Sequence, residues 1–217
     1  MKEIGIGVIG TGFMGKAHSI AYSASASVFG TGLRPRLEMV CDLSPERAQI
    51  RAADLGFSRY SSDWREVVND PAVELISVCT PNDTHAEISI AALAAGKHVW
   101  CEKPMSTTLT DSAAMRDMAI NSSAKTIIGY NYTKNPAVTH ARRLIEEGHI
   151  GRVSGFFCRY DVDNEADGSR PWSWRMSRDK SGTGANGDVL SHVISVGHYL
   201  TGSTISKVVG DIAIIHQ

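Results

Sequence analysis

The sequence lacks long apolar runs, an excess of one charge and a dense set of cysteines. None of its 217 residues lies in a stretch approaching the ~18 consecutive apolar residues of a membrane-spanning helix. Lys and Arg number 22 against 23 Asp and Glu, so a net charge of −1 provides no general basic surface for nucleic acid or an anionic membrane. Hydrophobic residues make up 42%, which is typical of a globular protein of one or two domains and excludes collagenous, coiled-coil and broadly disordered classes.

The four cysteines are far apart, and three of them lie in apolar, strand-like runs: Cys41, Cys79, Cys101 and Cys158. We expect reduced core thiols and neither a disulfide framework nor a zinc site. The first residues, MKEIGIGVIG, lead directly into an apolar strand and lack the features of a secretory signal. Together these features predict a cytoplasmic protein without a metal site.

Short apolar runs alternate with helical patterns as far as residue 129. We expect strands at 4–9, 37–41, 75–79, 98–101 and 126–129, with 57–60 as an optional further strand. The expected helices are 12–22, 44–56, 64–68, 85–95 and 109–121, the second of them with Ser44 as N-cap and Gly56 as its stop. This alternation predicts right-handed crossovers and an α/β, doubly wound parallel sheet of the Rossmann type over residues 1–125.

The pattern changes after residue 130. A helix at 136–147, a long strand at 152–163, a polar loop at 164–184, a helix at 188–200 and a strand at 207–216 are expected. Two strands do not make a stable covered sheet. Residues 126–217 are therefore expected to be the start of an α+β domain whose large, mainly antiparallel open sheet is incomplete. We expect exposed apolar surface around 156–163 and 208–215, prone to association.

A glycine-rich turn between the first strand and the first helix predicts a dinucleotide site. Gly10, Gly12 and Gly15 have the G-x-G-x-x-G spacing that brings backbone and helix N-terminus to a pyrophosphate, and Thr11, Phe13 and Met14 belong to the same turn. Asp42 ends the second strand and can accept hydrogen bonds from ribose hydroxyls, which favours NAD. Its distance from Gly15 is longer than usual, and we attribute this to a loop at 28–36. Arg47 could instead accommodate a phosphate, so NADP stays possible.

Two later segments carry a resemblance to a known family. Residues 79–106 contain T-P-N-x-x-H and E-K-P, and residues 171–202 contain G-D-x-x-x-H. In this order, and together with the glycine turn, they resemble the glucose–fructose oxidoreductase and inositol dehydrogenase family, often called Gfo/Idh/MocA. The resemblance covers essentially the whole chain. It implies an NAD(P)-dependent oxidoreductase that transfers a hydride between a polyol or sugar and nicotinamide, most similar to the inositol and sugar dehydrogenases.

The resemblance also implies roles for particular residues. Lys103 of E-K-P would be the acid/base at the substrate hydroxyl, next to Glu102 at the cofactor, and its bond to Pro104 is expected to be cis. Asp188 and His192 are four residues apart and share one face of a helix. They would form a catalytic pair in which His192 moves the hydroxyl proton and Asp188 orients the substrate. The same spacing also suits a helix salt link or, less well, a metal pair.

Further contacts are implied at the cofactor and the substrate. The cofactor contacts would be Thr80, Asn82, His85, Trp174 and Arg175, and the substrate contacts Lys103, Asp188, His192, Tyr130 and Asn131, with Tyr132 beside them. For His85 the alternative is a cap on the following helix. For Trp174 and Arg175 the alternative is a structural loop anchor.

Two alternative functions stay open from the sequence. The same motifs would serve a glycosidase that uses NAD transiently, or a non-catalytic cofactor-binding protein. Family members usually continue with more strands, which often form the interface of a homo-oligomer. The 217-residue chain is thus either a fragment or a short variant, and we expect weak or absent activity for it as written.

Overall fold

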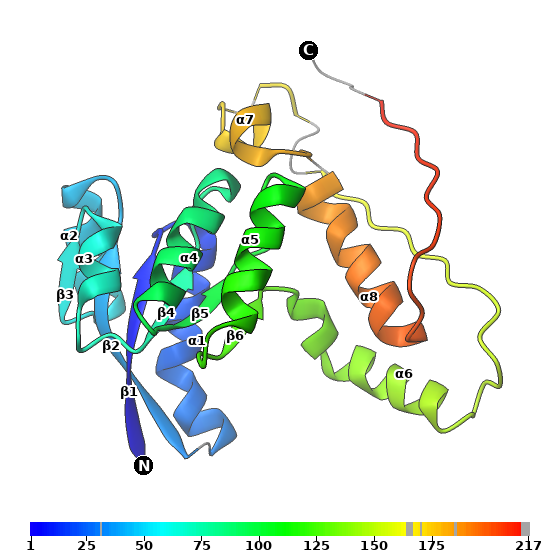
Figure 1. The fold of residues 1–217 in the computed structure, drawn as a ribbon, viewed down its shortest axis with the longest axis horizontal. Helices are drawn as coiled ribbons and strands as arrows, with labels where there is room; N and C mark the ends of the chain where they lie inside the picture. The colour runs from blue at the N-terminus through cyan, green and yellow to red at the C-terminus, as the bar shows by residue number, and fades with distance from the viewer. Residues whose placement is uncertain (31, 164–166, 170, 185, 214–217) are drawn as a thin grey trace.

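The computed structural model describes residues 1–30, 32–163, 167–169, 171–184 and 186–213. It has a parallel sheet flanked by helices, followed by a smaller helical part (Figure 1). In the first part the elements are β1 (Lys2–Ile9), α1 (Phe13–Phe29), β2 (Leu33–Cys41), α2 (Pro45–Leu55), β3 (Arg59–Ser61), α3 (Trp64–Asn69), β4 (Leu75–Val78), η1 (Asn82–Thr84), α4 (His85–Ala94), β5 (His98–Cys101), α5 (Leu109–Ile120) and β6 (Thr126–Ile128). In the second part they are η2 (Asn131–Lys134), α6 (Pro136–Glu146), η3 (Trp174–Met176), α7 (Arg178–Ser181), η4 (Asn186–Leu190) and α8 (Ser191–Thr201).

The sheet has the order β3-β2-β1-β4-β5-β6, and every pair of neighbours is parallel. The predicted doubly wound α/β fold is therefore confirmed. The chain runs outward from β1 to β3 and then returns to the other side of β1 with β4. Strand order thus reverses between β1 and β4, and ligands of such sheets bind at the carboxyl ends of the strands on either side of this point.

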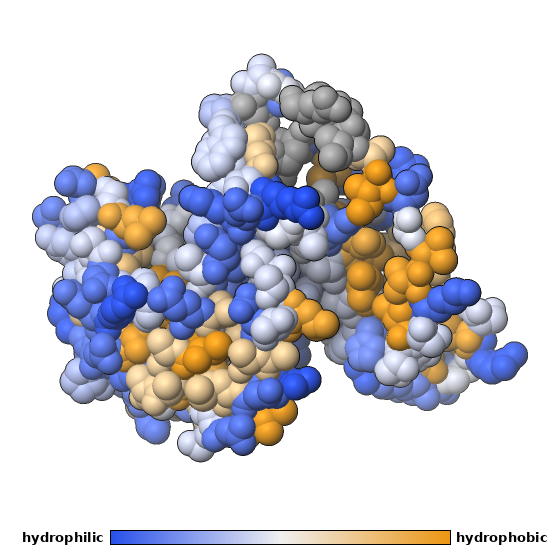
Figure 2. Space-filling model, turned by 45° about the horizontal axis from the view of Figure 1, so that its top comes forward, coloured by the Kyte–Doolittle hydropathy of each residue, from blue (hydrophilic) through white to orange (hydrophobic). Residues whose placement is uncertain are grey.

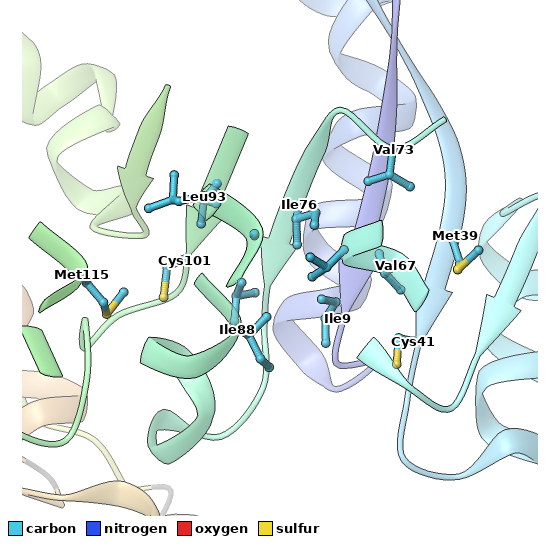
Figure 3. Close-up of a cluster of buried hydrophobic side chains, with 14 residues drawn as sticks. Ile9, Met39, Cys41, Val67, Val73, Ile76, Ile88, Leu93, Cys101 and Met115 are labelled. Carbon is cyan, nitrogen blue, oxygen red and sulfur yellow. The ribbon is translucent and has the colours of Figure 1, made fainter. Parts of the chain in front are cut away.

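Successive side chains of each strand point to opposite faces of the sheet, so the core has two layers. In β1, Ile6 and Val8 pack with Phe57 on one face, whereas Ile9 belongs to a second cluster on the other face. Figure 3 shows this second cluster, in which side chains from the strands meet those of α3, α4 and α5. Gly7 lies on the same face as Ile9. A Cβ atom there would lie 2.5 Å from the side chain of Val67, so glycine lets α3 lie close to the sheet.

Most predicted boundaries lie close to the observed ones. Ser44 caps α2 by accepting a hydrogen bond from the backbone N–H of Arg47, and Gly56 ends the helix with φ of 80°. The predicted loop at 28–36 is wrong, because α1 continues to Phe29 and β2 begins at Leu33. The first residues of β2 pair in register with the first residues of β1, so the neighbouring strand sets the length of β2.

The second part differs more from expectation. The strands predicted at 152–163 and 207–216 do not form in the described residues, and residues 214–216 lie outside them. No neighbouring strand is present among the described residues to supply ladder partners, and the predicted antiparallel sheet is likewise absent from them. The expected exposed apolar side chains are confirmed, with Phe157 91% and Val209 89% exposed. Apolar side chains gather on the lobe that contains α8 (Figure 2).

The division of the chain at residues 125 and 126 stays a prediction. β6 pairs with β5 and so belongs to the first sheet. In the second part α6 and α8 lie side by side (Figure 1). Two ion pairs link successive turns of α6, with Arg142 Nε 2.7 Å from Glu146 Oε1 and Arg143 Nε 3.8 Å from Glu147 Oε1.

Candidate functional site

The glycine turn leaves room for a ligand at one position only. A Cβ atom on Gly10 would lie 2.5 Å from the carbonyl oxygen of Cys79, and one on Gly15 would lie 1.9 Å from that of Gly10. At Gly12 nothing lies within 4 Å of the equivalent position. No side chain caps the N-terminus of α1, and its first turn, which includes Phe13 and Met14, holds no acidic residue. Its first N–H groups can therefore bind an anion, as the pyrophosphate of NAD requires.

Asp42 lies at the end of β2 next to this turn. One carboxylate oxygen accepts hydrogen bonds from the backbone N–H and hydroxyl of Thr11, and the other accepts them from Arg47 and from the backbone N–H of Ser44. Burial raises the pKa of Asp42, but these bonds and the charge of Arg47 outweigh burial and hold the pKa below its usual value. Arg47, the candidate phosphate ligand, is thus already paired with a carboxylate.

Lys103 and Asp188 are brought together from distant parts of the chain. Lys103 follows β5, and its Nζ donates to Oδ1 of Asp188 at 2.6 Å and to the backbone oxygen of Asp188 at 2.7 Å. The lysine side chain is 14% exposed and the aspartate side chain 38% exposed. Asp188 lies in η4, a single turn of π-helix, a geometry often found at functional sites. The predicted cis peptide bond between Lys103 and Pro104 is confirmed.

A second cation holds the other oxygen of Asp188. Arg175 Nε lies 3.4 Å from Asp188 Oδ2, and its guanidinium lies 4.6 Å from the ring centroid of Trp174. Burial raises the pKa of Asp188, but the hydrogen bond and charge of Lys103, together with Arg175, outweigh it and lower the pKa below its usual value. Asp188 is therefore ionised at neutral pH. For Trp174 and Arg175 this geometry fits the alternative of an anchor that fixes the site.

His192 is buried beside two tyrosine rings. Its ring centroid lies 4.5 Å from that of Tyr132 and 6.0 Å from that of Tyr130, and its Nδ1 has no hydrogen-bond partner among the described residues. Burial lowers the pKa of His192, and the charge of Lys103 lowers it further, so the imidazole is neutral at pH 7. The hydroxyl of Tyr132 lies 2.5 Å from that of Tyr160. Asn131, a predicted substrate contact, is exposed beside them.

The turn after β4 holds other parts of the chain in place. Asn82 is buried, and its Nδ2 donates to the backbone oxygen of Ser181 at 3.0 Å. His85 is 1% exposed, and its ring nitrogens lie 2.9 Å and 3.0 Å from the carbonyl oxygens of Pro104 and Thr80. Burial lowers the pKa of His85. This geometry favours a structural role for Asn82 and His85 over direct contact with a cofactor.

Two residues near the site, His18 and Tyr160, are not among those that the sequence predicts. His18 lies on α1, and its Nε2 is 2.9 Å from Oε1 of Glu102. The sequence signal for His18 is a histidine three residues after Gly15, on the helix that follows the glycine turn. Tyr160 lies in a segment that the sequence predicts as a regular strand, and no sequence signal indicates its contact with Tyr132.

Two family models match the chain. The oxidoreductase family model for the NAD-binding Rossmann fold, GFO_IDH_MocA, matches residues 4–130, which is more than half of the chain. The model of the GFO/IDH/MocA C-terminal domain matches residues 138–217. The chain belongs to the Gfo/Idh/MocA oxidoreductase family. Its first part is therefore that family's NAD-binding domain, as the glycine turn predicts.

Relatives of this chain include sugar and polyol dehydrogenases. The chain is 42% identical over 203 residues to levoglucosan dehydrogenase of Pseudarthrobacter phenanthrenivorans, covering 93% of this chain and 52% of that protein. It is 31% identical over 147 residues to inositol 2-dehydrogenase of Rhizobium meliloti, covering 68% and 42%. The chain thus spans about half the length of the curated relatives it matches.

Solved structures have the same fold. Levoglucosan dehydrogenase in complex with NADH and levoglucosan superimposes with a TM-score of 0.86 at 38% identity, over 93% of this chain and 55% of that one. An oxidoreductase domain protein from Kribbella flavida gives 0.87 at 40% identity, with 93% and 55% covered. In the described part of this chain, no helix is long and apolar enough to cross a bilayer. Among those residues no group of three or more His, Cys, Asp or Glu side chains is placed to hold a metal ion.

Proposed function

We propose that this family member is an NAD-dependent dehydrogenase acting on a sugar or polyol hydroxyl. The observation that carries the proposal is the meeting of Lys103 and Asp188, with a neutral His192 close by, at the carboxyl end of β5. An amine, a carboxylate and an imidazole are the groups that an alcohol oxidation needs for binding a hydroxyl and accepting its proton. The open position at Gly12 and the free N-terminus of α1 support NAD at the same edge of the sheet.

The mechanism assigns one task to each side chain. Asp188, ionised and held by Lys103 and Arg175, orients Lys103 and accepts a hydrogen bond from a substrate hydroxyl. The proton of the reacting hydroxyl passes to His192, which its lowered pKa leaves neutral and able to accept it at pH 7. It passes either directly or by way of Lys103 Nζ, which accepts it only after the ammonium has given one of its own protons to His192. Tyr130 and Tyr132 pack against the imidazole and exclude water from it. NAD, when bound, supplies the acceptor for the hydride that leaves the same carbon.

For the cofactor we propose NAD rather than NADP. The carboxylate of Asp42 is ionised and fixed beside the glycine turn, where a 2′-phosphate would meet its charge. Arg47 is paired with that carboxylate and is not available as a separate phosphate ligand without breaking the pair. Replacing Asp42 by Ser should narrow the preference for NAD over NADP, measured as the ratio of the two dissociation constants. A ratio unchanged within about twofold would contradict this role.

The decisive experiment removes the proton acceptors. Lys103→Ala and His192→Ala should each lower turnover by about 10²- to 10⁴-fold, as expected for lost acid–base catalysis, while the Kd for NADH changes little. Formation of NADH is followed by absorbance with levoglucosan, inositols and monosaccharides as substrates. Net NADH formation with free sugars separates a dehydrogenase from a glycosidase that uses NAD transiently.

A matched control is available in Lys97. Its Nζ also donates to two backbone carbonyl oxygens, those of Asp70 and Val73, both at 2.7 Å, but at a different edge of the fold. Lys97→Met should lower the free energy of unfolding and leave turnover per folded molecule unchanged. Equal losses of turnover in the Lys97 and Lys103 variants would count against the assigned role. The homo-oligomer and the cytoplasmic location inferred from the sequence stay predictions.

A further inference from the structure

A chain of hydrogen bonds runs through the core under the site. The hydroxyl of Tyr22 lies 2.8 Å from Oγ of Ser77, and this oxygen lies 3.0 Å from Nδ1 of His18. Nε2 of His18 lies 2.9 Å from Oε1 of Glu102. The His18 ring also packs on Trp100, with centroids 4.5 Å apart. The mechanism above uses none of these side chains.

The chemistry of the groups fixes the direction of these bonds. An ionised carboxylate only accepts, so His18 Nε2–H donates to Glu102. In the tautomer that carries its proton on Nε2, Nδ1 accepts from Ser77, whose oxygen accepts from Tyr22. Burial raises the pKa of Tyr22, which keeps it a donor. Ser77 is 0% exposed, so the Ser–His–Glu sequence of contacts is no hydrolytic triad, because no substrate reaches the serine.

Glu102 is held from several sides. Its backbone N–H donates to the carbonyl oxygen of Val78 at 3.0 Å, which ties it to β4. Its carboxylate lies against Gly129, where a Cβ atom would be 2.5 Å from Oε1. A buried carboxylate without a partner would be strongly unfavourable, and among the described residues only His18 hydrogen-bonds to the carboxylate of Glu102. The contact with His18 therefore fixes where Glu102 lies.

We propose that His18 and Glu102 are a positioning pair for Lys103. Lys103 is the next residue after Glu102, so fixing the glutamate fixes the start of the loop that directs Nζ toward Asp188. His18 lies on α1, the helix whose N-terminus faces the glycine turn. The pair thus links the cofactor-binding helix to the acid/base loop through one buried contact. This inference rests on the proposed function only for what Lys103 does.

The test compares variants that break this contact with one that weakens the network elsewhere. Glu102→Gln keeps the shape and loses the charge, and His18→Gln keeps an N–H donor near the position of Nε2. Tyr22→Phe is the matched control, because it removes one buried hydroxyl at the far end of the same network and leaves the His18–Glu102 contact intact. Thermal unfolding establishes how much each variant is destabilised.

Two readouts do not depend on turnover. The rate at which an amine-reactive reagent modifies Lys103, measured by mass spectrometry, reports how firmly Nζ is held. Glu102→Gln should raise this rate by about 3- to 30-fold, the range expected for weakening one buried charge-assisted hydrogen bond. His18→Gln should raise it less, because a donor remains. The Kd for NADH should stay within about twofold in all variants.

Where a sugar substrate is turned over, kcat of Glu102→Gln should fall about tenfold with little change in KM, and Tyr22→Phe should keep the wild-type kcat. Modification rates in Glu102→Gln equal to those in Tyr22→Phe at similar loss of stability would overturn the proposal and leave only a structural role. Because weak or absent turnover is expected of this 217-residue chain, failure of the unaltered protein to bind NADH is the result that would instead contradict the proposed function. The modification rates would still decide the inference.

Discussion

The contact between Asn82 and Ser181 holds the second part of the chain against the first. Asn82 follows β4, and Ser181 ends α7, so one buried bond joins segments almost a hundred residues apart. Next to it, a Cβ atom on Gly182 would lie 3.0 Å from Thr107, which means that backbone packs closely there. This docked segment lies between Arg175 and Asp188 in the sequence. The position of this segment therefore determines where Arg175 and Asp188 lie.

Asn82→Ala removes this donor, and the carbonyl oxygen of Ser181 then keeps only its hydrogen bond from the backbone N–H of Thr183 at 3.1 Å. The net loss of one hydrogen bond costs about 0.5–1.5 kcal/mol. If the whole cost weakens the docking of this segment, the undocked population rises by about 2- to 12-fold, since each 1.4 kcal/mol is a factor of ten. Turnover should fall as well, because Asp188 is then less often in contact with Lys103.

Limited trypsin digestion measures the undocked population directly. Arg178 and Lys180 lie in α7, and cleavage there should accelerate in Asn82→Ala by the same factor where opening and closing are faster than cutting. Asn121→Ala is the matched control, because its amide donates to the backbone oxygen of Asp117 at 2.9 Å on the exposed end of α5. Equal cleavage rates in the two variants, or faster cleavage throughout the first sheet as well, would refute local docking by Asn82.

Three further predictions concern the cofactor turn and the dependence on pH. Gly12→Ala should fold normally and bind NADH at least about tenfold more weakly in fluorescence titrations, whereas Gly15→Ala should lower the midpoint of thermal unfolding, because its Cβ would meet the backbone of the glycine turn. Turnover of the alcohol should be constant above the lowered pKa of His192 and should fall as pH drops through it, an acid limb that kcat profiles detect. The lowered pKa of Asp188 contributes stability above the unfolded carboxyl pKa, and this is lost as pH falls through the folded value. In Asp188→Asn the stability should therefore depend less on pH in the acid range. The midpoint of thermal unfolding, measured as a function of pH, checks this.

Local patterns predicted the first part of the fold well. Alternating apolar runs, the Ser44 cap and the Gly56 stop are written within a few residues of chain, so the parallel sheet and its helices follow from short-range physics. The length of β2 does not follow from local patterns, because its polar first residues become part of the strand by pairing with β1. The strands expected at 152–163 and 207–216 do not form in the part of the chain that the structure describes, since a strand forms only where a neighbour supplies hydrogen bonds.

The amino-acid sequence specifies which chemical groups are present and in what order: a glycine turn, an E-K-P segment and an aspartate with a histidine four residues later. Tertiary packing sets which of these groups meet. It brought Lys103 to Asp188, Asn82 to Ser181, and Glu102 to His18 on α1. Contacts of this kind join residues more than eighty positions apart, and their geometry depends on how strands and helices pack together, which no local pattern encodes.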